Sequence, residues 1–256
     1  MKKTIIACCI LITFLVIVWW FSGKEIKDKS TEVDYTIELQ QTENNCATLE
    51  KPAEPSPAVR ILDSLGLINI HEINPTIGVQ LKYATTDNFT GQVLYKDLTD
   101  AYLQPDVAVM LGKAQKYLRS LYPELNLLVY DAARPLSVQQ IMWDCVKDTP
   151  YRNYIAHPDK AGLHNYGAAV DLTIADSAWS PLDMGTPFDF FGKKAGTGNE
   201  KELEKQGLLN IRQVENRQLL RKVMHHAGFR SISGEWWHFN ACTLNEAQKR
   251  YPLIRN

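Results

Sequence analysis

The chain has 256 residues, of which 45% are hydrophobic and 22% are charged, a balance that excludes a protein disordered over its whole length. This length allows one medium-sized domain with an appendage. The formal net charge of −1 lacks the basic excess that a phosphate-binding surface needs, so we expect no nucleic-acid partner.

The N-terminus carries an apolar segment. Lys2 and Lys3 precede an uncharged run over residues 4–21, which as a helix would extend about 27 Å, close to the hydrocarbon thickness of a bilayer. The run ends in Trp19-Trp20-Phe21, where a signal-peptide cleavage site would have small residues. Residues 1–23 are therefore predicted to be a membrane anchor or signal segment, with an uncleaved anchor favoured over a cleaved signal or a lipoprotein. Each alternative exports the rest of the chain to the periplasm or the outer face of the membrane, with membrane contact through residues 4–21 only.

A polar segment follows. Residues 24–58 are rich in charged and amide side chains and end in the proline-rich stretch 51–57, which predicts a semi-extended linker. Residues 59–256 form the predicted folded domain. Outside the apolar run, three cysteines allow at most one intrachain disulfide, and buried free thiols are the favoured interpretation. These cysteines are Cys46, Cys145 and Cys242.

The domain shows a mixture of helical and strand patterns. Apolar residues at helical spacing predict three helices, and short apolar or alternating runs predict three strands. In chain order we expect a helix at 106–122, a strand at 127–131, a helix at 136–146, a strand at 167–174, a helix at 211–227 and a strand at 229–240. This order favours an α+β fold, with a small, mainly antiparallel sheet flanked by helices, over a parallel doubly wound sheet.

The first candidate metal ligands are His164 and Asp171, with Gly167 between them. Alternation in the predicted strand places Asp171 on the face opposite Val170 and Leu172. A carboxylate in an apolar strand is costly to bury unless it is paired or metal-bound. His164, on the incoming turn, could reach the same point across Gly167. By itself this spacing fits a hydrogen-bonded structural pair as well as a pair of metal ligands.

A second motif, Gly234-Glu235-Trp-Trp-His238, completes a candidate zinc site. A catalytic zinc ion needs three protein ligands, a water and a nearby carboxylate that accepts the proton of the water. His164, Asp171 and His238 would supply the ligands for one Zn²⁺ per subunit, and Glu235 the base. Since residues three apart in a strand face opposite ways, we expect a bulge or turn between Glu235 and His238.

Arg134 stands at the end of a predicted strand, just before Pro135, which opens the next helix. A guanidinium there could donate hydrogen bonds to the oxyanion that forms on a scissile carbonyl. The alternative is a salt bridge between Arg134 and Asp131, and the spacing favours neither.

These motifs resemble those of the D-alanyl-D-alanine dipeptidases of the vancomycin-resistance type. The resemblance lies in five blocks that run in order through residues 70–240: Lys82–Gly91, Tyr130–Pro135, Gly162–Thr173, Met184–Phe191 and Glu235–His238. It implies zinc ligation by His164, Asp171 and His238, base catalysis by Glu235 and transition-state stabilisation by Arg134. It also implies that Asp189 anchors the ammonium group of a small dipeptide substrate and that Tyr83 lines the pocket.

The resemblance implies hydrolysis of D-Ala-D-Ala, in which a zinc-bound water attacks the peptide carbonyl with Glu235 as base. One position departs from the family pattern: Gly162 stands where the family often has a serine that contributes to substrate binding. Glycine has no side-chain donor, so the resemblance supports the zinc chemistry more strongly than the choice of D-Ala-D-Ala as the substrate. A D,D-carboxypeptidase or another murein peptidase on the same scaffold is the alternative. A non-catalytic zinc-binding module is a further alternative, and it would need neither Glu235 nor Arg134.

Overall fold

The computed structural model describes residues 54–256. The predicted membrane segment at 1–23, most of the predicted linker at 24–58 and Cys46 lie outside the described residues. Helix α2 (Pro57–Ser64) begins before the predicted domain start at 59, and the domain division stays a prediction. None of the helices within 54–256 is both long and apolar enough to cross a membrane.

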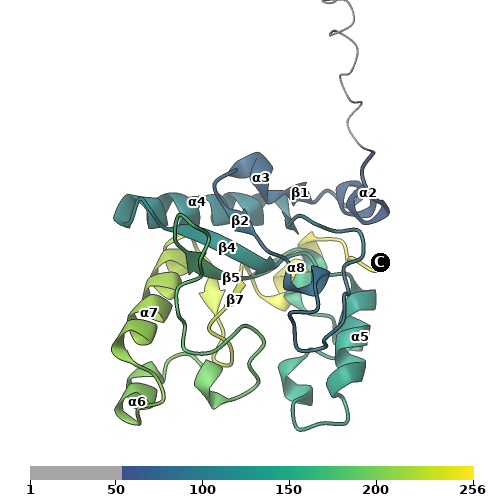
Figure 1. Cartoon of the computed structure of the whole chain (residues 1–256). Helices are drawn as coiled ribbons and strands as arrows, with labels where there is room; N and C mark the ends of the chain where they lie inside the picture. Colours follow the sequence, from purple (N-terminus) through teal and green to yellow (C-terminus); the bar gives the residue numbers. More distant parts are fainter. Residues whose placement is uncertain (1–53) are drawn as a thin grey trace, which may run out of the picture. The chain divides into compact units, whose positions relative to one another are not determined.

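A five-stranded sheet forms the centre of the domain, with the order β2-β4-β5-β7-β6 (Figure 1). Only β2 and β4 pair in parallel, and the other three neighbouring pairs are antiparallel, so the predicted small and mainly antiparallel sheet is confirmed. The strands are β2 (Gly78–Val79), β4 (Asn126–Asp131), β5 (Ala169–Ala175), β6 (Arg230–Ser231) and β7 (His238–Asn240). Two further strands, β1 (Ile68–Asn69) and β3 (Tyr102–Leu103), pair with each other.

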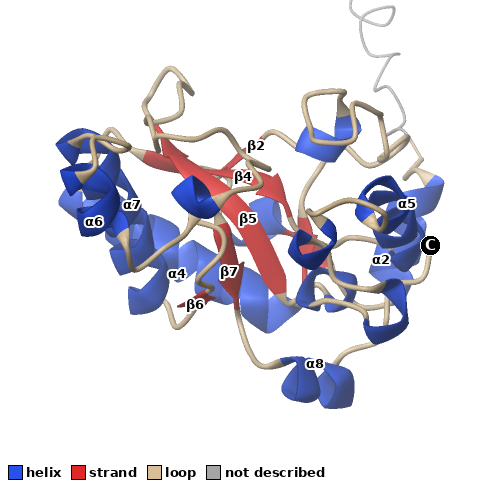
Figure 2. Cartoon of the chain, turned by 90° about the horizontal axis from the view of Figure 1, so that it is seen from below, coloured by secondary structure: helices blue, strands red, loops and turns tan. Residues whose placement is uncertain are grey.

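Helices surround this sheet, which confirms the α+β fold. They are α3 (Ile70–Ile73), α4 (Pro105–Leu121), α5 (Leu136–Val146), α6 (Glu200–Lys205), α7 (Ile211–His226) and α8 (Leu244–Arg250). Helices α4 and α7 pack against each other and against β4 and β5, whereas α5 lies at the opposite end of the sheet from α6 (Figure 2). Val129 of β4 and Val170 and Leu172 of β5 belong to the main buried core between these layers.

The final strand predicted at 229–240 is wrong in its extent. Two short antiparallel strands, β6 and β7, replace it, and residues 232–237 connect them. The connection bends at Trp236 and Trp237, which confirms the turn expected between Glu235 and His238. Large aromatics favour strands, but here both indole rings are buried against the core while the backbone turns.

Strand β5 is buried along its whole length. The alternation predicted for it is present, because Val170, Leu172 and Ile174 enter the main core. Asp171, on the other face, is only 3% exposed, so this face is also covered by protein. Cys242 is buried as expected, whereas Cys145 is exposed, and neither bonds to another described cysteine.

Candidate active site

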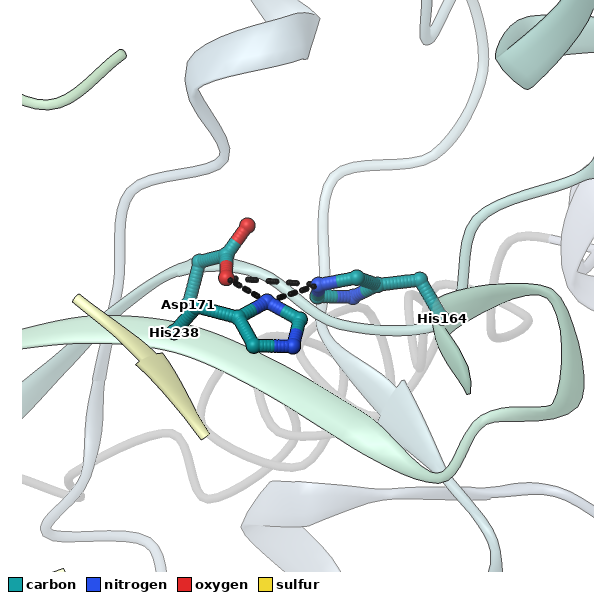
Figure 3. A group of neighbouring side chains, drawn as sticks. All are labelled: His164, Asp171 and His238. Atoms are coloured by element: carbon teal, nitrogen blue, oxygen red, sulfur yellow. Dashed lines mark hydrogen bonds and ion pairs between the residues drawn. The ribbon is translucent and has the colours of Figure 1, made fainter. Parts of the chain in front are cut away.

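Three predicted ligands converge at one point of the sheet (Figure 3). Asp171 on β5 lies directly opposite His238 on β7, and the atoms Asp171 Oδ1 and His238 Nδ1 are 2.9 Å apart. His164 comes from the turn before β5, and its Nε2 is 3.2 Å from each of these two atoms. Gly167, with φ +64°, reverses the chain between His164 and the strand, and a Cβ there would come within 2.7 Å of Leu67.

In each histidine, the ring nitrogen that does not face Asp171 (the outer nitrogen) already makes a hydrogen bond. Nδ1 of His164 lies 2.7 Å from the carbonyl oxygen of Ala132, which can only accept a hydrogen bond, so this nitrogen carries the proton. Nε2 of His238 lies 2.7 Å from Oδ1 of Asn240 and donates in the same way. A neutral imidazole has one N–H, so the inner nitrogens of both rings present lone pairs to the Asp171 carboxylate.

Three acceptor atoms this close to one another repel unless a cation or a proton lies between them. Zinc bonds of about 2.0–2.1 Å at tetrahedral angles place ligand atoms about 3.3 Å apart, close to the 2.9–3.2 Å spacing seen here. The residues therefore fit a divalent metal such as zinc.

A buried ion pair extends this row of side chains across β4. Asp131 lies opposite Asp171 in the sheet register and is 0% exposed. Its carboxylate accepts hydrogen bonds from Tyr95 Oη at 2.6 Å and from Arg134 Nε at 2.8 Å. Burial alone would lower the pKa of Arg134, but Asp131 raises it well above its ordinary value, so the guanidinium stays charged.

Arg134 also faces Asp171, one of the three predicted ligands. Its Nη2 is 3.5 Å from Asp171 Oδ2, while Nη1 donates to Oε1 of Gln139 at 2.9 Å. Both interpretations of Arg134 are therefore compatible with the geometry: the residue is paired with Asp131, and its guanidinium still lines the same cavity as the three ligands.

Glu235 lines this cavity from the turn that precedes β7. Its carboxylate makes no hydrogen bond to any other described side chain or backbone group, so its oxygens are open to a water or a substrate. Burial raises the pKa of Glu235 to about 7. Such a value suits a group that accepts and returns a proton near neutral pH.

Asp189 lines the same cavity from the segment between β5 and α6. It adopts φ +61°, and its carboxylate accepts hydrogen bonds from Tyr83 Oη at 3.0 Å and from the Phe89 backbone N–H at 3.4 Å. Burial, followed by the negative charge of Asp171, raises the pKa of Asp189 to about 7. A cationic group of a ligand would relieve the cost of burying this carboxylate.

The seven predicted site residues line a single cavity of about 340 Å³. They are Tyr83, Arg134, His164, Asp171, Asp189, Glu235 and His238. The structure brings them together, and their individual roles stay predictions. Sequence reasoning missed the supporting side chains of Tyr95, Gln139 and Asn240, which carry no local motif, and it considered Asp131 only as an alternative partner of Arg134.

Comparison with known proteins gives a matching family model and several similar proteins. A family model described as D-ala-D-ala dipeptidase matches residues 63–253. The chain is similar to the D-alanyl-D-alanine dipeptidase of Escherichia coli (strain K12), with 32% identity over 192 residues, covering 75% of this chain and 91% of that protein. It is also similar to the D-alanyl-D-alanine dipeptidase of Enterococcus faecalis (strain ATCC 700802 / V583), with 29% identity over 199 residues, covering 68% of this chain and 90% of that one.

Proposed function

Since the chain belongs to the D-ala-D-ala dipeptidase family of metallopeptidases, we propose that it hydrolyses the free dipeptide D-Ala-D-Ala with one zinc ion held by His164, Asp171 and His238. The observation that carries this proposal is the meeting of three lone-pair atoms within 2.9–3.2 Å of one another. Asp189, Glu235 and Arg134 line the same cavity, which provides the groups that peptide hydrolysis needs beside a metal.

Glu235 is the proposed base. When bound, zinc lowers the pKa of a water molecule and polarises a carbonyl oxygen. The free carboxylate of Glu235 accepts a proton from the attacking water and then delivers it to the nitrogen of the leaving amine. Its raised pKa of about 7 favours both halves of this transfer.

Arg134 and Asp189 are the proposed substrate-binding groups around the scissile bond. The guanidinium of Arg134, held rigid by Asp131 and Gln139, donates to the oxygen that gains charge in the transition state. Asp189 accepts hydrogen bonds from the substrate ammonium, with Tyr83 beside it. A negative carboxylate at this place selects a free amino terminus.

We also propose that the domain acts outside the cytoplasm. The support is the sequence alone, in which Lys2, Lys3 and the apolar run at 4–21 have the pattern of an export segment.

A substrate panel tests the proposed function. The zinc-loaded protein is offered D-Ala-D-Ala, N-acetyl-D-Ala-D-Ala and a murein pentapeptide, and the released D-Ala is measured. We expect cleavage of the free dipeptide and at least about 100-fold lower kcat/KM for the blocked compounds, because a buried carboxylate without its cationic partner is penalised. Efficient cleavage of the blocked compounds alone would identify the D,D-carboxypeptidase activity instead.

A further inference from the structure

The loop that carries Asp189 is attached at both of its ends to one side chain. This loop, residues 184–196, leaves the sheet after β5 and returns before α6. Arg217 on α7 donates from Nε to the carbonyl oxygen of Met184 at 2.7 Å. Its Nη1 donates to the carbonyl oxygens of Lys194 at 3.0 Å and Gly196 at 3.3 Å.

Arg217 is an expensive residue to bury. It is 1% exposed, it has no carboxylate within salt-bridge distance in the described part of the chain, and its Nη2 has no hydrogen-bond partner there. Burial lowers its pKa to about 10, so it remains a cation at neutral pH. A buried charge that is bonded only to carbonyl groups contributes poorly to stability, which favours a role in fixing the loop.

Neighbouring side chains of α7 hold only the incoming end of the loop. Gln213 Nε2 donates to the Asp183 carboxylate at 2.8 Å, and Asn216 Nδ2 donates to the Asp183 carbonyl oxygen at 2.9 Å. Arg217 differs from both because its planar guanidinium bonds the incoming and the outgoing ends together. It therefore fixes the separation between the two ends of the loop.

Asp189 lies between the two ends that Arg217 joins. Phe188 and Phe191, on either side of it in the loop, pack against Tyr83 and Phe89 respectively, and Asp189 itself bonds to Tyr83 and Phe89. A change in the spacing of the loop ends would shift the carboxylate relative to the metal ligands on β5 and β7.

We propose that Arg217 is a positioning residue for substrate recognition, which fixes the loop at 184–196 so that Asp189 meets the substrate ammonium. This inference rests on the proposed function, in which Asp189 binds that ammonium. Arg217 acts through the backbone of the loop and touches neither the substrate nor the metal ligands.

Two substitutions test the role of Arg217. Arg217→Lys keeps the charge but has one compact donor that cannot span both ends of the loop, and Arg217→Gln removes the buried charge, so that folding does not depend on satisfying it. The matched control is Arg221→Met, one turn further along α7, which loses an ion pair with Glu200 and no bond to the loop. Each zinc-loaded variant is assayed with D-Ala-D-Ala and with its N-acetyl derivative.

For Arg217→Lys and Arg217→Gln we expect the KM for D-Ala-D-Ala to rise about tenfold, kcat to change by less than about threefold, and the preference for the free over the N-acetylated dipeptide to fall about tenfold. Arg221→Met should keep the wild-type KM and preference. If Arg217 had a purely structural role, its loss would lower kcat by reducing the amount of active protein. The KM for D-Ala-D-Ala and the preference for the free dipeptide would then stay at wild-type values, and this result in folded variants would overturn the inference. A wild-type protein that does not discriminate between the two dipeptides would instead overturn the proposed role of Asp189.

Discussion

Replacing Asp189 with asparagine should stabilise the domain while it weakens substrate binding. The pKa of Asp189 rises from an ordinary 3.8 to about 7 in the fold, because burial penalises the ionised form. This difference corresponds to at most about 4 kcal/mol of folding free energy at alkaline pH. Asparagine removes the charge, can still accept hydrogen bonds from Tyr83 and Phe89, and tolerates the φ of +61°.

The sign of the pH dependence follows from this raised pKa. Between the unfolded and folded pKa values of Asp189 the folded state binds more protons at this residue. The contribution of Asp189 to wild-type stability therefore falls as pH rises from about 4 to about 7 and is then constant. The gain from Asp189→Asn should be near zero at pH 4 and about 1–4 kcal/mol at pH 8, since bound zinc offsets the repulsion from Asp171 but not the burial. Urea denaturation of wild type and variant, compared with each other at each pH and zinc-loaded at pH 8, measures this gain, since histidine ligands release zinc from both proteins at pH 4.

The same variant should lose ammonium recognition. Loss of a charge-assisted hydrogen bond of about 1.5–3 kcal/mol predicts a fall of about 10- to 100-fold in kcat/KM for D-Ala-D-Ala, with little change for the N-acetyl derivative. The reasoning would be refuted by an Asp189→Asn protein that is less stable than wild type at pH 8, or by one that retains full kcat/KM.

Three further substitutions address other parts of the site. Glu235→Gln should lower kcat by about 10²- to 10⁴-fold with zinc content unchanged; undiminished hydrolysis of D-Ala-D-Ala would exclude the base role. Asn240→Ala removes the acceptor that orients His238 and should weaken zinc binding by about 10- to 100-fold. Competition with a chelator measures the zinc affinity, and an unchanged affinity would contradict the tautomer assigned to His238. Gly162→Ser should fold normally, because a Cβ there meets nothing nearer than Ala156 at 3.6 Å. A lowered KM for D-Ala-D-Ala in this variant would show that the missing hydroxyl had loosened substrate binding. An unchanged KM would show that it had not.

The long helices and the central strands could be predicted because their patterns are local. Apolar residues at helical spacing define α4 and α5. Most of those in α4 are buried as expected, whereas in α5 Val138 and Met142 are buried but Ile141 and Cys145 are exposed. Strands β1, β2 and β6 have two residues each, too few for any alternation to be read. The strand predicted at 229–240 failed because its aromatic residues indicate burial, which a turn against the core satisfies as well as a strand does.

The meeting of the three candidate metal ligands could be predicted because each motif keeps its residues close in the chain. His164 and Asp171 are brought together by one left-handed glycine, and Glu235 and His238 by one turn. The alignment of Asp131 opposite Asp171, and of Asp171 opposite His238, depends on strand register across the sheet, which local patterns do not specify. The hydrogen bonds from Tyr95 to Asp131 and from Arg217 to the loop that carries Asp189 arise only in the folded protein.

Titration of the metal-free protein with zinc tests the central claim most directly. The domain is stripped with a chelator, and hydrolysis of D-Ala-D-Ala is followed as Zn²⁺ is added to wild type and to His238→Ala. If His164, Asp171 and His238 hold the catalytic ion, activity should rise linearly to a plateau at one zinc per chain, and the variant should remain inactive at that ratio. Full activity of the stripped protein, or a His238→Ala variant that titrates like wild type, would contradict the account.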